Sequence, residues 1–165
     1  MPALVATMIS LGVLATIDTY LTATILPVPV WVTFIAWASF YASGGGQLGF
    51  VKSVASNGTG IVIGSLTLLA IHFGVKDPMF AAICVGIGTA AMAFVSIVPL
   101  LSFTPAVVFG FASTVGTVAA TGKNIVTMDV SHPAIIAAVA MLLGASFGFV
   151  SQVGSNVLAR KPALA

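Results

Sequence analysis

The chain has 165 residues, of which 59% are hydrophobic and only 5% are charged, and its formal net charge is +2. Soluble globular domains carry about 25% charged residues, so this composition excludes that class. The five basic residues are too few and too scattered to form a nucleic-acid-binding surface.

Long, continuous apolar segments favour membrane-spanning helices over the alternating strands of a membrane barrel. We predict an all-α integral membrane protein with six transmembrane helices, arranged as one polytopic domain over residues 1–165. Spans of about 20 residues fill this length, which leaves no room for a soluble domain. The predicted helices cover about residues 3–26, 30–51, 60–74, 78–98, 104–121 and 133–158.

The first predicted helix ends at the prolines of Pro27-Val28-Pro29 and contains one acidic residue, Asp18. A carboxylate within a span costs at least about 2.5 kcal/mol unless it is protonated, paired or hydrated. Two interpretations stay open: Asp18 is a buried functional acid, or it lies close enough to the outer interface to be solvated. For the first interpretation, His72 near the end of the third predicted helix is the partner that we consider.

The second predicted helix carries aromatic residues on two faces. Helical spacing places Trp31, Phe34 and Tyr41 near one face, and Trp37 with Phe40 near another. These rings either narrow a pore or form an interfacial aromatic belt that also packs against neighbouring helices.

Three consecutive glycines, Gly44-Gly45-Gly46, interrupt the second helix and precede Gln47. Glycine weakens a helix and exposes backbone groups that hydrocarbon cannot satisfy. The break therefore indicates either a wet site, where Gln47 and the nearby Asn57 bind a neutral polar solute, or a plain helix end before a loop at Lys52. Lys52 and Lys123, which end the second and fifth predicted helices, line the mouths of a pathway or act as snorkelling anchors.

Helix-start signals precede the last three predicted helices. Asp77 is expected to be an N-cap with Pro78 at the first helical position, and Thr104-Pro105 and Ser131-His132-Pro133 repeat this pattern. Glycine pairs spaced four residues apart predict close approach of helix backbones. These pairs are Gly45 with Gly49, Gly60 with Gly64, and Gly144 with Gly148.

The two halves of the chain, about residues 1–75 and 76–165, resemble one another. At an offset of 71 residues the matched pairs are Thr33 with Thr104, Phe40 with Phe111, Gly45 with Gly116, and Lys52 with Lys123. Three helices in each unit would place the second unit upside down in the membrane. This inverted-repeat architecture is common among channels and secondary transporters.

The distribution of basic residues predicts the orientation. With the N-terminus inside, the cytoplasmic side holds Lys52, Arg160 and Lys161, whereas the outer side holds Lys76 and Lys123. The excess of positive charge inside favours cytoplasmic placement of both termini.

Neither a catalytic nor a metal-binding constellation is visible, and Glu is absent altogether. The string Gly44-x-Gly46-x-x-Gly49 lacks the strand and the acidic residue of a dinucleotide site. The string Gly144-Ala145-Ser146-Phe147-Gly148 lies inside a predicted span rather than between a strand and a helix, as a nucleophile elbow requires. We therefore expect no enzymatic activity, no cofactor and no metal.

The segment from Leu26 to Ala42, LPVPVWVTFIAWASFYA, is followed by the glycine run, Lys52 and Ser56-Asn57-Gly58-Thr59-Gly60. This pattern resembles the DUF1097 family of small bacterial inner-membrane proteins, and the resemblance spans most of the chain. It implies a bacterial cytoplasmic-membrane location and a short polytopic fold. Because the function of that family is unknown, the resemblance implies no site residues.

We expect a channel or facilitator for a small neutral or weakly polar solute, of the urea-like or amide-like class, that forms a homo-oligomer in the lipid bilayer. The first alternative is a non-transporting subunit that binds a partner membrane protein, and the second is a proton-coupled carrier that uses Asp18. The candidate pathway residues are Asp18, Trp37, Tyr41, Gln47, Lys52, Asn57, His72, Lys123 and His132.

Overall fold

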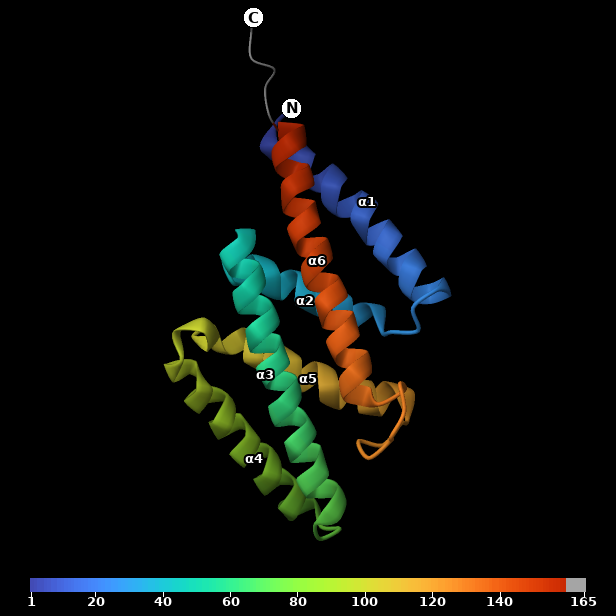
Figure 1. Cartoon of the computed structure of the whole chain (residues 1–165), viewed down its shortest axis with the longest axis vertical. Helices are drawn as coiled ribbons and strands as arrows, with labels where there is room; N and C mark the ends of the chain where they lie inside the picture. The colour runs from blue at the N-terminus through green and yellow to red at the C-terminus, as the bar shows by residue number, and fades with distance from the viewer. Residues whose placement is uncertain (160–165) are drawn as a thin grey trace, which may run out of the picture.

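The structure, a computed structural model, describes residues 1–159, and its regular elements in that range are helical (Figure 1). Five apolar segments are long enough to cross a membrane, so the chain is a multi-pass membrane protein. The sixth, α2, has 13 residues and extends only about 20 Å. The helices are α1 (Ala3–Thr24), α2 (Val30–Ala42), α3 (Gly46–Phe73), α4 (Pro78–Phe94), α5 (Thr104–Thr121) and α6 (Pro133–Ala159), with 3-10 turns η1 (Val95–Ile97) and η2 (Pro99–Leu101) after α4.

The predicted boundaries of the second and third helices, 30–51 and 60–74, are wrong. Helix α2 ends at Ala42, and α3 continues without interruption from Gly46 to Phe73. The turn between them needs glycine, because Gly44, Gly45 and Gly46 have φ values of 100°, 66° and 63°, which other residues rarely adopt. The segment 52–59, expected between those two helices, is helical because its small residues lie close to the α5 backbone, as at Asn57 and Gly110.

Each of the two longest helices is crossed by a shorter helix, α3 by α5 and α6 by α2 (Figure 1). A Cβ atom built on Gly60 would lie 1.9 Å from the Val107 carbonyl oxygen, and one built on Gly144 would lie 1.9 Å from the Thr33 carbonyl oxygen. The predicted close approach of backbones is thus confirmed at these two glycine pairs. The third pair does not lie on one helix, because Gly45 precedes α3.

Helix α1 packs antiparallel along α6. Ser10 Oγ donates a 2.8 Å hydrogen bond to the Ser151 carbonyl oxygen, and a Cβ on Gly154 would meet the Ser10 hydroxyl at 2.7 Å. The beginning of α1 therefore lies beside the end of α6, as Figure 1 shows at the top of the molecule.

The two predicted aromatic faces of α2 are confirmed. Trp37 and Phe40 are buried, whereas Trp31, Phe34 and Tyr41 are 37–42% exposed. Trp37 stacks on Phe34 and on Phe147, and Phe40 packs edge-on against Tyr41 and Phe149. The buried face of α2 is thus a packing surface against α6.

The last three helices begin at the predicted residues, but their N-terminal caps are not always the predicted side chains. Asp77 caps α4 by accepting hydrogen bonds from the Met79 and Phe80 amides at 2.9 and 3.1 Å. Thr104 is the first residue of α5 rather than its cap. At the start of α6, His132 Nδ1 accepts a hydrogen bond from the Ala134 amide at 3.1 Å, so His132, and not the preceding Ser131, caps this helix.

Candidate functional site

A closed ring of three hydrogen bonds joins α2 to α3. Ser39 Oγ donates to Asn57 Oδ1 at 3.1 Å, Asn57 Nδ2 donates to Ser53 Oγ at 3.3 Å, and Ser53 Oγ donates to Ser39 Oγ at 2.9 Å. All three side chains are buried. Because each group both donates and accepts, the ring is internally satisfied, and Asn57 keeps one N–H and one carbonyl lone pair for a further partner.

Asn57 also lines a cavity of about 210 Å³ between α3 and α6. The remaining walls are largely apolar and come from Val54, Gly58, Ile61, Ala138, Met141 and Leu142. At about 30 Å³ for each water molecule, this volume equals about seven waters. The cavity therefore combines room for a small molecule with one amide group at its edge.

Threonine hydroxyls, buried at Thr114 and Thr117 and exposed at Thr121, lie on one side of α5 and lead away from the Asn57 ring. The backbones touch at Gly110, where a built Cβ would lie 1.9 Å from the Asn57 carbonyl oxygen. Thr114, Thr117 and Thr121 donate to the carbonyl oxygens four residues earlier, at 3.0, 2.7 and 2.7 Å. Since each hydroxyl hydrogen is used, the outward-facing lone pairs of these oxygens can accept from another molecule.

Two further hydroxyls near this line, those of Ser56 and Ser113, are buried and have no hydrogen-bond partner among residues 1–159. A buried hydroxyl without a partner costs about 1–3 kcal/mol. These groups have hydrogen-bonding capacity that the described part of the chain does not use.

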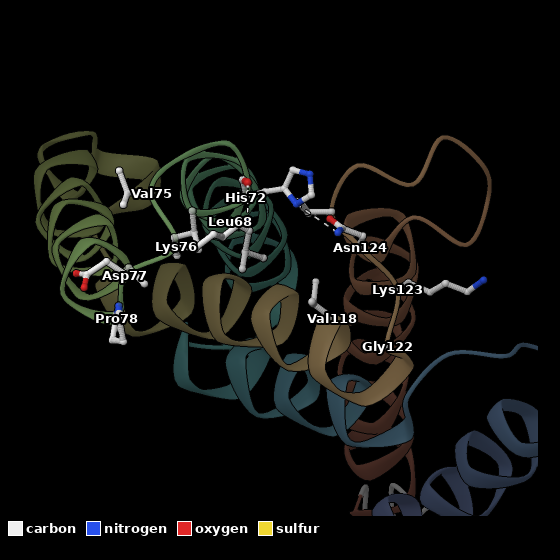
Figure 2. Close-up of a pocket in the computed structure, with 13 residues that line it drawn as sticks. Leu68, His72, Val75, Lys76, Asp77, Pro78, Val118, Gly122, Lys123 and Asn124 are labelled. Atoms are coloured by element: carbon white, nitrogen blue, oxygen red, sulfur yellow. Dashed lines mark hydrogen bonds between the residues drawn. The ribbon is translucent and has the colours of Figure 1, made fainter.

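The largest cavity near candidate residues, about 580 Å³, opens where α3 and α5 end and α4 begins (Figure 2). Its polar lining residues are His72, Lys76, Asp77, Lys123 and Asn124, and His72 Nδ1 lies 3.3 Å from Asn124 Nδ2. Figure 2 shows Lys123 extending away from the cavity. Its floor is apolar and includes Leu68, Ile71 and Val118.

His132 supports one wall of this cavity from behind. Its Nδ1 accepts from the Ala134 amide, so the ring hydrogen is on Nε2, which donates to the Ile125 carbonyl oxygen at 2.8 Å. Ile125 is buried and lines the cavity. His72, Lys123 and His132 are thus gathered at the same end of the molecule.

The loop between α5 and α6 contains an acidic residue, Asp129, outside the helices. Ser131 donates to Asp129 Oδ1 through its hydroxyl at 2.5 Å and through its amide at 2.7 Å. These two hydrogen bonds, first that of the hydroxyl, lower the pKa of Asp129 below its ordinary value of 3.8.

Asp18 does not contact His72, so the proposed pair is wrong. The Asp18 carboxyl is fully buried, and its Oδ2 atom shares a hydrogen bond with the Thr33 hydroxyl of α2. Its Oδ1 atom has no hydrogen-bond partner within residues 1–159. The separation follows from the packing, because α1 lies on α6 and α2 while His72 bonds to Asn124 beyond α5.

Trp37 and Tyr41 meet at a residue that was not predicted, Ser151 of α6. Trp37 Nε1 donates to Ser151 Oγ at 3.0 Å, and the Tyr41 hydroxyl lies 2.8 Å from the same oxygen. This contact fixes α2 on α6 and supports packing rather than a pore constriction.

Gln47 and Lys52 lie apart from the other candidates, on the first turns of α3. Gln47 is exposed and lines a surface groove with Phe50, Val51 and three residues of α6. Lys52 lies inside α3, whereas Lys123 follows the end of α5, so the two lysines do not occupy equivalent helix ends. Arg160 and Lys161 lie outside the described residues.

The sequence profile of the family described as "Protein of unknown function (DUF1097)" matches residues 8–156. The chain belongs to the DUF1097 family. No curated protein and no solved structure is detectably similar to it. For this DUF1097 member, the arrangement of buried polar groups is therefore the guide to function. Among the residues that the structure describes, no three His, Cys, Asp or Glu side chains are grouped as metal ligands would be.

Sequence reasoning identified Asn57 but missed its partners Ser39 and Ser53, and it missed Thr33 and Ser151. One signal was present in the sequence: Ser53, Ser56 and Asn57 recur at helical spacing within an apolar segment. Small polar residues in this pattern indicate hydrogen bonds between membrane helices.

Proposed function

We propose that this protein is a passive channel or facilitator for a small neutral or weakly polar solute in the bacterial cytoplasmic membrane. The observation that carries the proposal is the line of hydroxyls on α5. It runs from the exposed Thr121, whose neighbour Gly122 lines the cavity at His72, through Thr117 and Thr114 to Gly110, which touches the Asn57 backbone. Hydrogen-bonding groups along such a path would replace water around the solute.

The chemistry of the path supports a solute rich in N–H donors. The threonine hydroxyls of α5 have used their hydrogens on backbone carbonyls and present acceptor lone pairs. Urea-like and amide-like molecules donate through several N–H groups and carry no net charge. Thr114 and Thr117 are fully buried, so the path is closed in this structure and permeation requires local movement.

The two matching helix crossings support an inverted repeat of three-helix units. Helix α5 crosses α3 at Gly60 and Gly64, and α2 crosses α6 at Gly144 and Gly148. In both crossings the second glycine faces a phenylalanine, Phe111 for Gly64 and Phe40 for Gly148; these are the residues matched at an offset of 71. In transporters with this architecture, solutes bind between the repeats near the bilayer midplane.

The adjacent ends of α1 and α6 support an even number of membrane crossings. With five long spans, the short α2 and its flanking segments must complete the sixth crossing. Short spans interrupted by proline or glycine often mark the binding site in transporters, and α2 lies between Pro29 and Gly44. We place both termini in the cytoplasm, because Lys52 lies in the first turns of α3, whose start bonds to Gln152 near the end of α6, and because Arg160 and Lys161 follow α6 in the sequence.

Proteoliposomes test the proposal. Vesicles are shrunk osmotically with urea or acetamide, and the rate of reswelling is followed by stopped-flow light scattering. The purified protein should accelerate reswelling relative to empty vesicles and should leave a sucrose gradient intact. Crosslinking in the same vesicles tests the expected homo-oligomer.

A matched pair of variants tests the path. Thr117→Val removes one acceptor from the path, and the loss of one hydrogen bond worth about 0.5–1.5 kcal/mol should slow urea entry by about 2- to 12-fold. Thr59→Val is the control, since Thr59 bonds to the Ala55 carbonyl of its own helix and does not line the path. Equal reswelling of protein-containing and empty vesicles would favour the non-transporting subunit.

A further inference from the structure

We propose that Asp18 is a buried proton-binding site, in which Oδ2 carries a proton and donates it in a hydrogen bond to the Thr33 hydroxyl. This site is independent of the proposed solute pathway. The number of hydrogens available to the oxygen atoms around Thr33 decides whether Asp18 carries a proton.

Thr33 Oγ1 makes two hydrogen-bonded contacts to oxygen atoms, one to Asp18 Oδ2 and one to the Val30 carbonyl oxygen at 2.6 Å. A threonine hydroxyl has a single hydrogen, and a backbone carbonyl has none. One hydrogen cannot serve both contacts with good geometry. The second hydrogen must therefore be carried by the carboxyl group of Asp18.

With that proton in place, both contacts are satisfied. The Asp18 carboxyl donates to Thr33 Oγ1, and Thr33 Oγ1 donates to the Val30 carbonyl oxygen. Asp18 Oδ1 is then the carbonyl oxygen of a neutral acid, so its lack of a partner within residues 1–159 leaves no buried charge uncompensated.

The surroundings of Asp18 favour the neutral acid. Helix α1 has no other charged side chain, and its one further titratable group is Tyr20. Helix α2 contributes only Tyr41, whose hydroxyl contacts Ser151, and α6 contains no ionisable residue. An ionised Asp18 would thus be a buried carboxylate without a counter-charge on any of the three helices, which is strongly unfavourable.

Release of this proton requires access to water. The Asp18 side chain is fully buried, so the packing around it must open locally before the carboxyl group can transfer its proton to water.

Infrared spectroscopy at pH 7 is a direct test, because the chain has only three side-chain carboxyl groups and no Glu. The protein in a carboxyl-free detergent should show the carbonyl stretch of a protonated carboxylic acid, and the band should shift in deuterated water. Asp18→Asn should abolish the band. This variant preserves the shape of the site, and its amide can donate to Thr33 as the acid does.

A double variant, Asp77→Asn with Asp129→Asn, keeps the test decisive if Asp18→Asn fails to fold. Both substituted residues are exposed, and Asp18 then remains as the one side-chain carboxyl group. The double variant should retain the full band at pH 7. A wild-type protein without the band, a double variant that loses it, or a folded Asp18→Asn protein that keeps it would overturn the proposal.

Discussion

Filling the cavity beside Asn57 separates a conducting protein from a packed membrane subunit. Gly58 lines this cavity, and a Cβ built on Gly58 meets no atom within 4 Å, so a larger side chain has room there. A leucine side chain adds four non-hydrogen atoms, each occupying roughly the 30 Å³ of a water molecule. Gly58→Leu therefore fills more than half of the 210 Å³.

The expected result is a folded protein with slow transport. Replacing glycine inside helix α3 should stabilise the helix by about 0.5–1 kcal/mol. A solute that must share the cavity with the new side chain meets an overpacking cost of about 1–3 kcal/mol, which corresponds to about 5- to 150-fold slower urea entry. The assay is reswelling of proteoliposomes, with thermal unfolding in detergent as the measure of folding.

Gly12→Leu on α1 is the matched control. Gly12 is exposed, and a Cβ built there also meets no atom within 4 Å. This variant should conduct like the wild type. Undiminished flux through Gly58→Leu would refute the reasoning, as would an equal loss of flux in both variants.

Further outcomes are expected for the helix crossing at Gly144 and for the loop at Asp129. Gly144→Ala should lower the unfolding temperature, because its Cβ would lie 1.9 Å from the Thr33 carbonyl oxygen and overpacking costs about 1–3 kcal/mol. Gly86→Ala is the control and should be neutral or stabilising, because a Cβ there meets nothing within 4 Å. Ser131→Ala should raise the pKa of Asp129 toward 3.8, which carbon NMR of the carboxyl group measures. The native pKa of Asp129 is lowered, so the hydrogen bonds from Ser131 to the ionised carboxylate should stabilise the loop above about pH 4. This stabilisation should be lost as the pH falls below 3.8. Hydrogen exchange of the loop amides between about pH 5 and 3 can detect the change.

Local signals in the sequence predicted the fold well where one or two residues decide the outcome. Asp77 and Pro78 fixed the start of α4, since a capping carboxylate and a proline act on their own helix. The glycine run indicated an interruption, because its turn requires positive φ angles, although the predicted helix extended past it to residue 51. Such features depend on short stretches of chain and not on the partners of the helix.

Sequence reasoning failed where tertiary packing overrides local preference. The run Ser53 to Gly60 is rich in serine, asparagine and glycine, which ordinarily indicates a loop. It is helical because these small residues allow the α5 backbone to come close and because Ser53 and Asn57 bond to Ser39. The sequence singles out Asp18, yet its partner Thr33 depends on which helices touch, and the helix pattern alone does not encode that.

Large apolar side chains lie on the outside of this protein and small polar side chains lie inside, the reverse of a soluble protein. This distribution explains why local signals succeeded while the contacts between helices could not be predicted. Large apolar residues such as Ile17, Leu66 and Ile87 are exposed, whereas Ser39 and Thr117 are fully buried. Lipid is as apolar as these exposed side chains, so burying them gains little, and the helices are instead held together by close backbone contacts and hydrogen bonds between small residues. Under the proposed function, the solute would use the same interior hydroxyls and amide that hold the bundle together, so transport and helix packing would place competing demands on one set of residues.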